Sequence, residues 1–197
     1  MEVVLASRNA KKLAEMQALL TPLGWQLRLV SDYTIDAAVE SASSFVENSL
    51  IKARHAAQVS GLPAIADDSG LEVAALNGAP GVYSARYAGE KASDADNNAK
   101  LLDALEGLDE SQRAARFVCV LTFMRHAADP TPVIAEGYWS GRILDAPHGE
   151  KGFGYDPLFF VPEHRCSSAQ LAPEVKNRCS HRALATAALL ARLRSAQ

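Results

Sequence analysis

Hydrophobic and polar positions alternate along the chain in patterns that predict strands mixed with helices. Residues 3–6 form a short, continuous apolar run, which is typical of a buried strand. Apolar residues at one-face helical spacing follow this run and end at Gly24, a residue type that commonly terminates helices. Residues 27–30 form the next apolar run, so the opening of the chain is predicted to be a β–α–β unit. The later runs that predict strands are 63–66, 117–124 and 133–144.

Three serines mark the predicted starts of further helices. Ser44 is followed three residues later by Glu47, a capping-box pattern that closes the first turn of a helix. Ser93 and Ser180 precede two other segments whose leucines recur at helical spacing. Strands mixed with helices throughout the chain predict an α/β fold on a largely mixed sheet.

Length, composition and charge narrow the class of protein. A chain of 197 residues without internal repeats or Ser/Pro-rich linkers predicts a single domain, 1–197. Hydrophobic residues make up 48% and charged residues 22%, which excludes an intrinsically disordered chain. The net charge of −3 argues against binding of nucleic acid through a general basic surface. A local basic pocket is compatible with this balance.

The cysteines and the N-terminus predict a cytoplasmic protein without membrane attachment. Cys119, Cys166 and Cys179 are odd in number and form no C-x-x-C pair, so a reduced environment is expected. The apolar opening meets Arg8 almost at once and is too short for a signal peptide. No stretch approaches the roughly 18 apolar residues that a membrane-spanning helix needs.

The first segment with candidate chemistry is 7–12, between the first strand and the first helix. Lys11 and Lys12 fall in the first turn of the predicted helix, where the helix dipole makes cations unfavourable. A phosphate bound at that helix start would reverse the penalty. The alternative is that both lysines are solvated surface residues. No Walker pattern is present, so a P-loop is excluded.

The second segment is the run Asp67-Asp68-Ser69-Gly70 at the end of a predicted strand. Adjacent carboxylates repel each other unless a cation or a hydrogen-bond network holds them. Mg²⁺ is bound by one or two carboxylates together with substrate phosphates, which fits this pair. The alternative is an Asx-turn that closes the strand.

The third segment, 152–157, places two glycines around a phenylalanine. Such a loop lets the backbone approach a ligand while the ring offers a flat face, although a simple turn with a buried aromatic is an alternative. His181 and Arg182 repeat the cation-loaded helix start of the first segment, with Lys176 and Arg178 just upstream. Two such helix starts and a carboxylate pair together favour binding of a polyphosphate and a metal ion.

These segments together resemble the inosine triphosphate pyrophosphatase family, also called dITP/XTP or non-standard purine NTP pyrophosphatases. The matching blocks run from residue 5 to residue 183: 7–12, 45–48, 52–53, 66–71, 78–81, 83–87, 152–157, 176 and 180–182. The departures are small. Arg8 stands where many members have glycine, and Lys151 replaces a glycine that is frequent before the Gly-Phe-Gly-Tyr-Asp block.

The resemblance implies an elongated α/β fold in which helices flank a long mixed sheet and two lobes enclose a nucleotide cleft. It implies hydrolysis of dITP, ITP and XTP to the nucleoside monophosphate and pyrophosphate, which cleanses the nucleotide pool. It also implies Mg²⁺ as the cofactor, a purine nucleoside triphosphate as the ligand and a homodimer as the assembly.

Residue roles follow from the matching positions. The resemblance makes Glu40 and Asp68 the Mg²⁺ ligands, and Asp68 also the catalytic residue that activates the attacking water. It gives substrate binding to Ser7, Arg8, Asn9, Ala10, Lys11, Lys12, Lys52, Ser69, Phe153, Gly154, Tyr155, Asp156, Lys176, His181 and Arg182. Asn48, one turn before Lys52 on the second helix, is expected to face the same cleft.

Three other functions compete with this interpretation. The Maf-like nucleotide pyrophosphatases, which share the fold superfamily, would hydrolyse pyrimidine or modified nucleotides instead. A non-catalytic nucleotide sensor could use the same cationic pocket, although no expected catalytic residue is missing here. A nucleic-acid-binding protein is disfavoured by the charge balance.

Overall fold

The computed structural model describes residues 1–195, which divide into two compact units. The first unit contains Met1–Asp68, Cys119–Gly137, and Arg182 with the described residues that follow it. The second unit contains Ser69–Val118 and Tyr138–His181. The expectation of a single domain stays a prediction.

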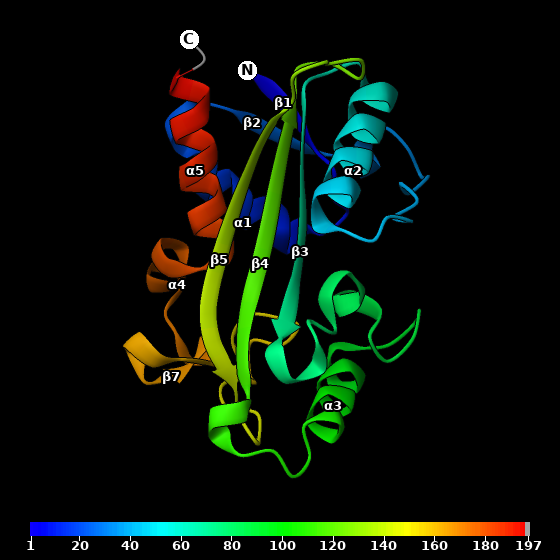
Figure 1. Cartoon of the computed structure of the whole chain (residues 1–197). Coiled ribbons are helices and arrows are strands. Elements are labelled where there is room, and N and C mark those ends of the chain that lie inside the picture. The colour runs from blue at the N-terminus through cyan, green and yellow to red at the C-terminus, as the bar shows by residue number, and fades with distance from the viewer. Residues whose placement is uncertain (196–197) are drawn as a thin grey trace. The chain divides into compact units, whose positions relative to one another are not determined.

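The strands form one mixed sheet, shown with its helices in Figure 1. The sheet has seven strands in the order β2-β1-β3-β4-β5-β6-β7. Strand β1 pairs in parallel with β2 and β3, whereas β6 is antiparallel to β5 and β7, so the predicted α/β fold with a mixed sheet is confirmed. The strands are β1 Glu2–Leu5, β2 Gln26–Leu29, β3 Ala64–Val73, β4 Ala114–Met124, β5 Val133–Ile143, β6 Phe159–Val161 and β7 Cys166–Ser167. The helices are α1 Ala10–Leu20, α2 Phe45–Ser60, α3 Asp94–Ala104, α4 Pro173–Cys179 and α5 His181–Ser195.

The first unit opens with the predicted β–α–β unit, β1–α1–β2. The helix ends at Leu20, and a short 3₁₀ turn, Thr21–Leu23, separates it from Gly24. Gly24 has a φ of 62°, the left-handed conformation that glycine adopts without strain. Its role as a terminator is therefore confirmed, but for the 3₁₀ turn rather than for the helix itself.

Side chains of the first unit alternate between two faces of the sheet, as the twofold period of a strand requires. Odd-numbered strand residues such as Leu5 and Ile65 pack in one core cluster with side chains of α1 and α5. Even-numbered residues such as Val4 and Ala66 pack with alanines of α2 in separate clusters on the other face. Two adjacent strand residues are therefore directed to different helices.

Strand β3 continues through the polar run, so the prediction that it ends at Asp67 is wrong. The Asx-turn alternative is excluded with it. Ser69 and Gly70 have little intrinsic preference for strands, but β3 lies between β1 and β4 in the sheet, and this tertiary setting overrides local preference.

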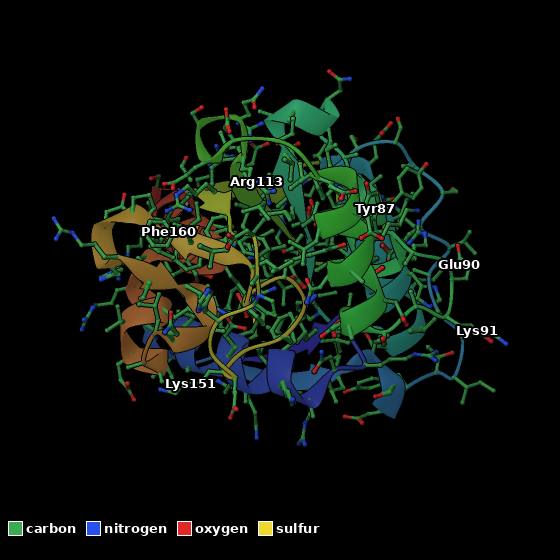
Figure 2. The ribbon with its side chains drawn as sticks, turned by 90° about the horizontal axis from the view of Figure 1, so that it is seen from below. Tyr87, Glu90, Lys91, Arg113, Lys151 and Phe160 are labelled. Atoms are coloured by element: carbon green, nitrogen blue, oxygen red, sulfur yellow. The ribbon has the colours of Figure 1, made fainter. Side chains whose placement is uncertain are left out.

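The second unit packs α3 and α4 with parts of β3–β7 around an aromatic core that includes Phe117, Trp139 and Phe159. Ser93 is the N-cap of α3, as predicted, and the structure shows that it forms a complete capping box with Asp96. Figure 2 labels Arg113, whose guanidinium donates to the carbonyl of Leu105, the C-cap residue of α3. The same guanidinium also donates to the carbonyls of Leu108 and Leu144. Helix α4, which carries Lys176, was not expected from the sequence, but the predicted start of α5 directly after Ser180 is confirmed.

Two expectations about the whole chain can be compared with residues 1–195. None of the helices in that part is both long and apolar enough to cross a membrane. No disulfide joins Cys119, Cys166 and Cys179 in that part of the chain, and the reduced environment expected from their number stays a prediction.

Candidate functional site

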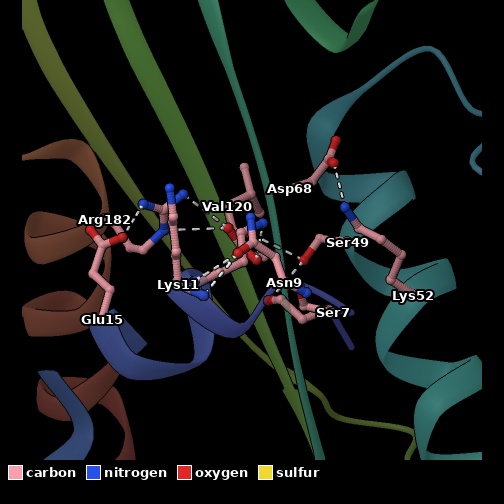
Figure 3. Close-up of polar contacts among 12 residues, drawn as sticks. Ser7, Asn9, Lys11, Glu15, Ser49, Lys52, Asp68, Val120 and Arg182 are labelled. Atoms are coloured by element: carbon pink, nitrogen blue, oxygen red, sulfur yellow. Dashed lines mark hydrogen bonds and ion pairs between the residues drawn. The ribbon is translucent and has the colours of Figure 1, made fainter. Parts of the chain in front are cut away.

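The loop before α1 is organised by its own side chains. Asn9 is the N-cap, and its Oδ1 accepts hydrogen bonds from the backbone N–H groups of Lys11 at 2.9 Å and Lys12 at 3.3 Å. The backbone N–H of Asn9 in turn donates to Ser7 Oγ at 3.1 Å. Figure 3 shows this bonded turn beside the strands. Because the cap occupies these N–H groups, an anion would be held here chiefly by lysine side chains.

The adjacent carboxylates of Asp67 and Asp68 lie on opposite faces of β3. Asp67 meets Lys12 of α1, whose Nζ lies 2.8 Å from its Oδ1, whereas Asp68 meets Lys52 of α2 at 2.6 Å. The strand thus relieves the repulsion expected of neighbouring carboxylates by giving each one its own lysine. This separation also gives the two residues different chemical surroundings.

Asp67 is the centre of a buried ion-pair network. Burial alone would raise its pKa, but Lys12 and Arg182 hold the pKa of this carboxyl well below its usual range. Arg182 Nη2 lies 3.4 Å from Asp67 Oδ2, and Arg182 Nη1 lies 2.9 Å from Glu15 Oε2. The network therefore joins the start of α5 to α1 and β3. The guanidinium of Arg182 is buried between these two carboxylates. Its predicted contact with the substrate stays a prediction.

Asp68 and Glu40 converge on the ammonium of Lys52. Its Nζ lies 2.6 Å from Asp68 Oδ1 and 3.6 Å from Glu40 Oε1. Burial raises the pKa of Asp68 against the opposing effect of Lys52. Burial also lowers the pKa of Lys52, but the surrounding carboxylates outweigh it and the net shift is upward. The proton affinity of Asp68 is therefore higher than that of an ordinary aspartate.

The donor set formed by Glu40 and Asp68 fits the Mg²⁺ ion that the resemblance implies. Both carboxylates approach the ammonium of Lys52, so they are close enough to each other to bind one metal ion together. Within residues 1–195, no group of three or more His, Cys, Asp or Glu side chains could hold a metal on its own. Mg²⁺ binding to one or two carboxylates is completed by water and substrate phosphates, which agrees with this small set.

A cavity of about 260 Å³ lies next to these groups in the first unit. It brings together five residues predicted for the site: Ser7, Arg8, Lys12, Glu40 and Lys52. Asp36 and His55 also line it, and neither was predicted. Ala10 and Lys11 are exposed at the start of α1 and are not among the lining residues. Asn48, which was expected to face the same space, is fully buried, is bonded to the backbone of Ala42 and is not among the lining residues.

In the second unit, Asp156 organises the Gly-Phe-Gly-Tyr-Asp loop. Its Oδ2 accepts from the backbone N–H of Phe153 at 2.9 Å and from Lys176 Nζ at 2.6 Å, and its Oδ1 accepts from Ser168 Oγ at 2.8 Å. A Cβ at Gly152 would overlap with Asp156 Oδ2, so this position requires glycine. Asp156 and Lys176 therefore have clear structural roles beside the predicted ligand contacts.

Other predicted residues of the second unit differ in their accessibility. Tyr155 is buried, its hydroxyl donates to Ser84 O at 2.8 Å, and burial raises its pKa. Phe153 is 37% exposed, with Lys176 Nζ 5.6 Å from the ring centroid. His181 is buried with its ring 4.8 Å from that of Phe117. Ser69 is half-buried within β3.

Gly154 is held by two side chains of α3 that sequence reasoning missed. Its N–H donates to Asp94 Oδ2 at 2.7 Å and its carbonyl accepts from Asn98 Nδ2 at 3.1 Å. Glu15 was missed in the same way. Asp94, Asn98 and Glu15 are far along the chain from the groups that they bind, so local sequence patterns give no indication of these contacts. The one available signal is the four-residue spacing of Asp94 and Asn98, which places both side chains on one face of a helix.

The fold and this site define an α/β protein with opposed carboxylate–lysine pairs and a lysine-bearing helix start, an arrangement suited to phosphate ligands. The chain belongs to the Ham1 family, whose model matches residues 3–192. This family match and the relatives named next confirm the resemblance.

The relatives cover almost the whole chain. The dITP/XTP pyrophosphatase of Vibrio parahaemolyticus is 57% identical over 192 residues, which cover 98% of this chain and 96% of that protein. The dITP/XTP pyrophosphatase of Pseudomonas syringae pv. tomato is also 57% identical, with the same coverage. The solved structure of a HAM1 protein from Coxiella burnetii has a TM-score of 0.91 at 50% identity and covers 99% of both chains.

Proposed function

We propose that this protein hydrolyses non-standard purine nucleoside triphosphates, with dITP, ITP and XTP as substrates and the nucleoside monophosphate and pyrophosphate as products. The observation that carries the proposal is the Lys52–Asp68 pair at 2.6 Å, with Glu40 on the same ammonium. The relatives named dITP/XTP pyrophosphatase support the substrate class. By removing such nucleotides, the protein would cleanse the nucleotide pool of the cytoplasm.

Asp68 is the residue that we propose to activate water. A water oxygen attacks the α-phosphorus, the bond from that phosphorus to the bridging oxygen breaks, and pyrophosphate leaves with the bond's electron pair. The proton released by the water passes to Asp68. A carboxylate whose pKa is raised by burial accepts this proton more readily than an exposed one. Lys52 holds the same carboxylate in a fixed orientation.

Lys12 and Lys52 supply positive charge at the cavity that we assign to the phosphates. Negative charge builds on the phosphate oxygens and on departing pyrophosphate, so positioning and cationic stabilisation dominate the rate of this reaction. We assign Mg²⁺ to Glu40 and Asp68, where a bound ion would neutralise phosphate charge and lower the pKa of a coordinated water. Ser7, Arg8 and the other predicted contacts are proposed as binding groups, and the homodimer is proposed from the resemblance.

Product analysis tests the proposal. Incubation with dITP or XTP, with and without Mg²⁺, should release the monophosphate and pyrophosphate in equal amounts, and only with the metal present. Chromatography distinguishes pyrophosphate from stepwise release of phosphate. Binding without any product would indicate the nucleotide sensor instead. Preferential hydrolysis of pyrimidine nucleotides would indicate a Maf-like activity.

A further inference from the structure

Glu40 lies on a loop that has little internal structure to hold it. This segment, residues 33–43 and here called the Glu40 loop, contains neither a helix nor a strand. Its two large aliphatic side chains point to solvent, since Ile35 is 89% exposed and Val39 is 76% exposed. A loop without apolar anchors depends on polar contacts for its position.

The C-terminal part of the loop is held by Asn48 of α2. The Oδ1 atom of Asn48 accepts from the backbone N–H of Ala42 at 3.0 Å, and its Nδ2 donates to the carbonyl of the same residue at 3.3 Å. One side chain thus satisfies both polar groups of one loop residue. Asn48 is fully buried, so these bonds are shielded from competition by water.

The N-terminal part of the loop is held by His55 of α2 and by Arg8. The Nε2 atom of His55 lies 3.3 Å from the carbonyl oxygen of Asp36, which can only accept, so the ring nitrogen is the donor. The guanidinium of Arg8 donates to the carbonyl of Ile35. Two adjacent loop carbonyls are therefore fixed from separate parts of the first unit.

The loop-holding residues have a regular relationship to Lys52. Asn48 precedes Lys52 by four residues and His55 follows it by three, so all three side chains lie along one face of α2. Lys52 is the central residue of the three, and its Nζ lies 3.6 Å from Oε1 of Glu40. One helix face therefore holds both parts of the loop and presents the cation between them.

We propose that Asn48 and His55 are positioning residues that fix Glu40 beside Lys52 and Asp68. They act through the backbone of the Glu40 loop, which they hold by the hydrogen bonds of their side chains. Their effect on turnover rests on the proposed function, whereas their effect on the loop does not. Without these bonds the loop samples positions in which Glu40 is no longer beside Lys52.

The test combines hydrogen–deuterium exchange with steady-state kinetics on His55→Ala, His55→Gln and the control Gln58→Ala. Gln58 is an exposed residue of the same helix. In His55→Ala, exchange at 35–41 should rise about tenfold, the factor expected for one lost hydrogen bond. With dITP and Mg²⁺, kcat should fall by a similar factor of about ten, with a smaller change in KM. The amide of His55→Gln keeps a donor and should restore most of both properties.

Asn48→Ala should have the same effects at 39–43, and a thermal melt will show whether that buried substitution leaves the protein folded. If Asn48→Ala does not fold, the His55 variants alone test the proposal. Unchanged exchange at 35–41 in His55→Ala would overturn the proposal, and so would faster exchange with an unchanged kcat. Absence of hydrolysis in the wild-type protein would refute the proposed function instead, and the exchange data would then decide the tethering alone.

Discussion

Lys52 donates a 2.6 Å hydrogen bond to Oδ1 of Asp68, which ties the middle of α2 to the middle of β3. The same strand directs its neighbour, Asp67, to the opposite face, where Lys12 of α1 is the partner. Alternation along a single strand therefore distributes two carboxylates and two lysines over both faces of the sheet. Asp68 is the carboxylate on the face of the cavity-lining residues Glu40 and Lys52.

Asp68→Asn should abolish turnover and leave the fold intact. The amide oxygen of the variant can still accept from Lys52, but the side chain can no longer accept a proton from water. We expect kcat to fall at least about 100-fold, or about 3 kcal/mol in the barrier, which is the scale of one lost transition-state interaction. Asp103→Asn, at an exposed position of α3, is the matched control. A variant that keeps more than about a tenth of wild-type kcat, well short of that scale, would show that Asp68 has another role.

The local parts of this arrangement could be predicted from the sequence, and the distant ones could not. The N-terminal signals at Ser44 and Ser93 depend on residues within one helical turn, and both helix starts are confirmed. At Ser44 the carboxylate of Glu47 accepts from the serine hydroxyl, and the capping box is not complete. The sequence predicts too early an end for the strand that contains Asp67, because the local sequence Asp-Asp-Ser-Gly is typical of a turn. Only its neighbours in the sheet keep that segment extended.

Contacts between remote side chains gave no signal at all. Arg182 and Glu15 are 167 residues apart in the chain, and the sequence around each residue does not indicate that it pairs with the other. The loop containing Glu40 has no hydrophobic period, so its tethers to His55 and Asn48 were not expected. Glu40 itself was assigned only through the resemblance.

Lys12→Ala should weaken binding of a triphosphate more than binding of a monophosphate. Lysine acts on phosphate as a point charge, and Lys12 lines the cavity that we assign to the phosphates. Isothermal titration with a non-hydrolysable ITP analogue and with IMP measures both affinities. Lys91→Ala, on an exposed segment of the second unit labelled in Figure 2, controls for loss of net charge. Equal losses for the two ligands would place Lys12 away from the phosphates.

Lys12→Ala also removes a partner of Asp67. Arg182 still faces that carboxylate, so the network keeps one cation and the variant is expected to fold. Breaking one partner of a buried pair costs on the order of 3 kcal/mol, which a chemical-denaturation curve measures independently of binding. A loss of stability with unchanged affinity for the triphosphate analogue would give Lys12 a structural role only.

Asp129→Asn should reduce stability in a manner that depends on pH. This buried carboxylate accepts from Arg125 Nε at 2.9 Å and from the backbone N–H groups of Arg125 and Thr131 at 3.0 Å. These bonds, led by that of the Arg125 side chain, hold the pKa of Asp129 well below its usual range. Its contribution to stability is therefore complete above the unfolded pKa of about 4 and is lost as the pH falls toward the folded pKa.

Urea unfolding of the wild type and of Asp129→Asn at pH 7 and at pH 3 checks the sign. Arg125 is largely exposed, so after allowance for solvent screening we expect a difference of about 1 kcal/mol at pH 7. The difference should shrink at pH 3, since the wild type has then lost part of its advantage. A difference that grows on acidification would contradict the assigned direction. Turnover should be unchanged, because Asp129 lies in the turn after β4 and outside the site.

Recognition of the base should depend on its edge and not on stacking. Phe153 is the accessible ring of its loop and can stack on any purine, whereas Tyr155 is buried and bonded through its hydroxyl. The N–H groups of Phe153 and Gly154 already donate to Asp156 and Asp94. These two donors are therefore occupied, so a 6-oxo group must be read by others.

The protein should hydrolyse ITP and XTP with a kcat/KM on the order of 100-fold higher than that for ATP, whatever donor reads the base. A 6-oxo group accepts a hydrogen bond, but adenine places an amino donor at the same position, so two donors would meet and both would lose their partners on burial. Each unpaired buried polar group costs about 1–3 kcal/mol, and two of them account for that ratio. GTP shares the 6-oxo group, so its rejection must come from the 2-amino group meeting a steric or polar penalty that the 2-oxo group of XTP escapes. Measurement of kcat/KM for ITP, XTP, GTP and ATP under one condition checks both steps, and equal efficiency with ATP and ITP would rule out selection at the 6-position.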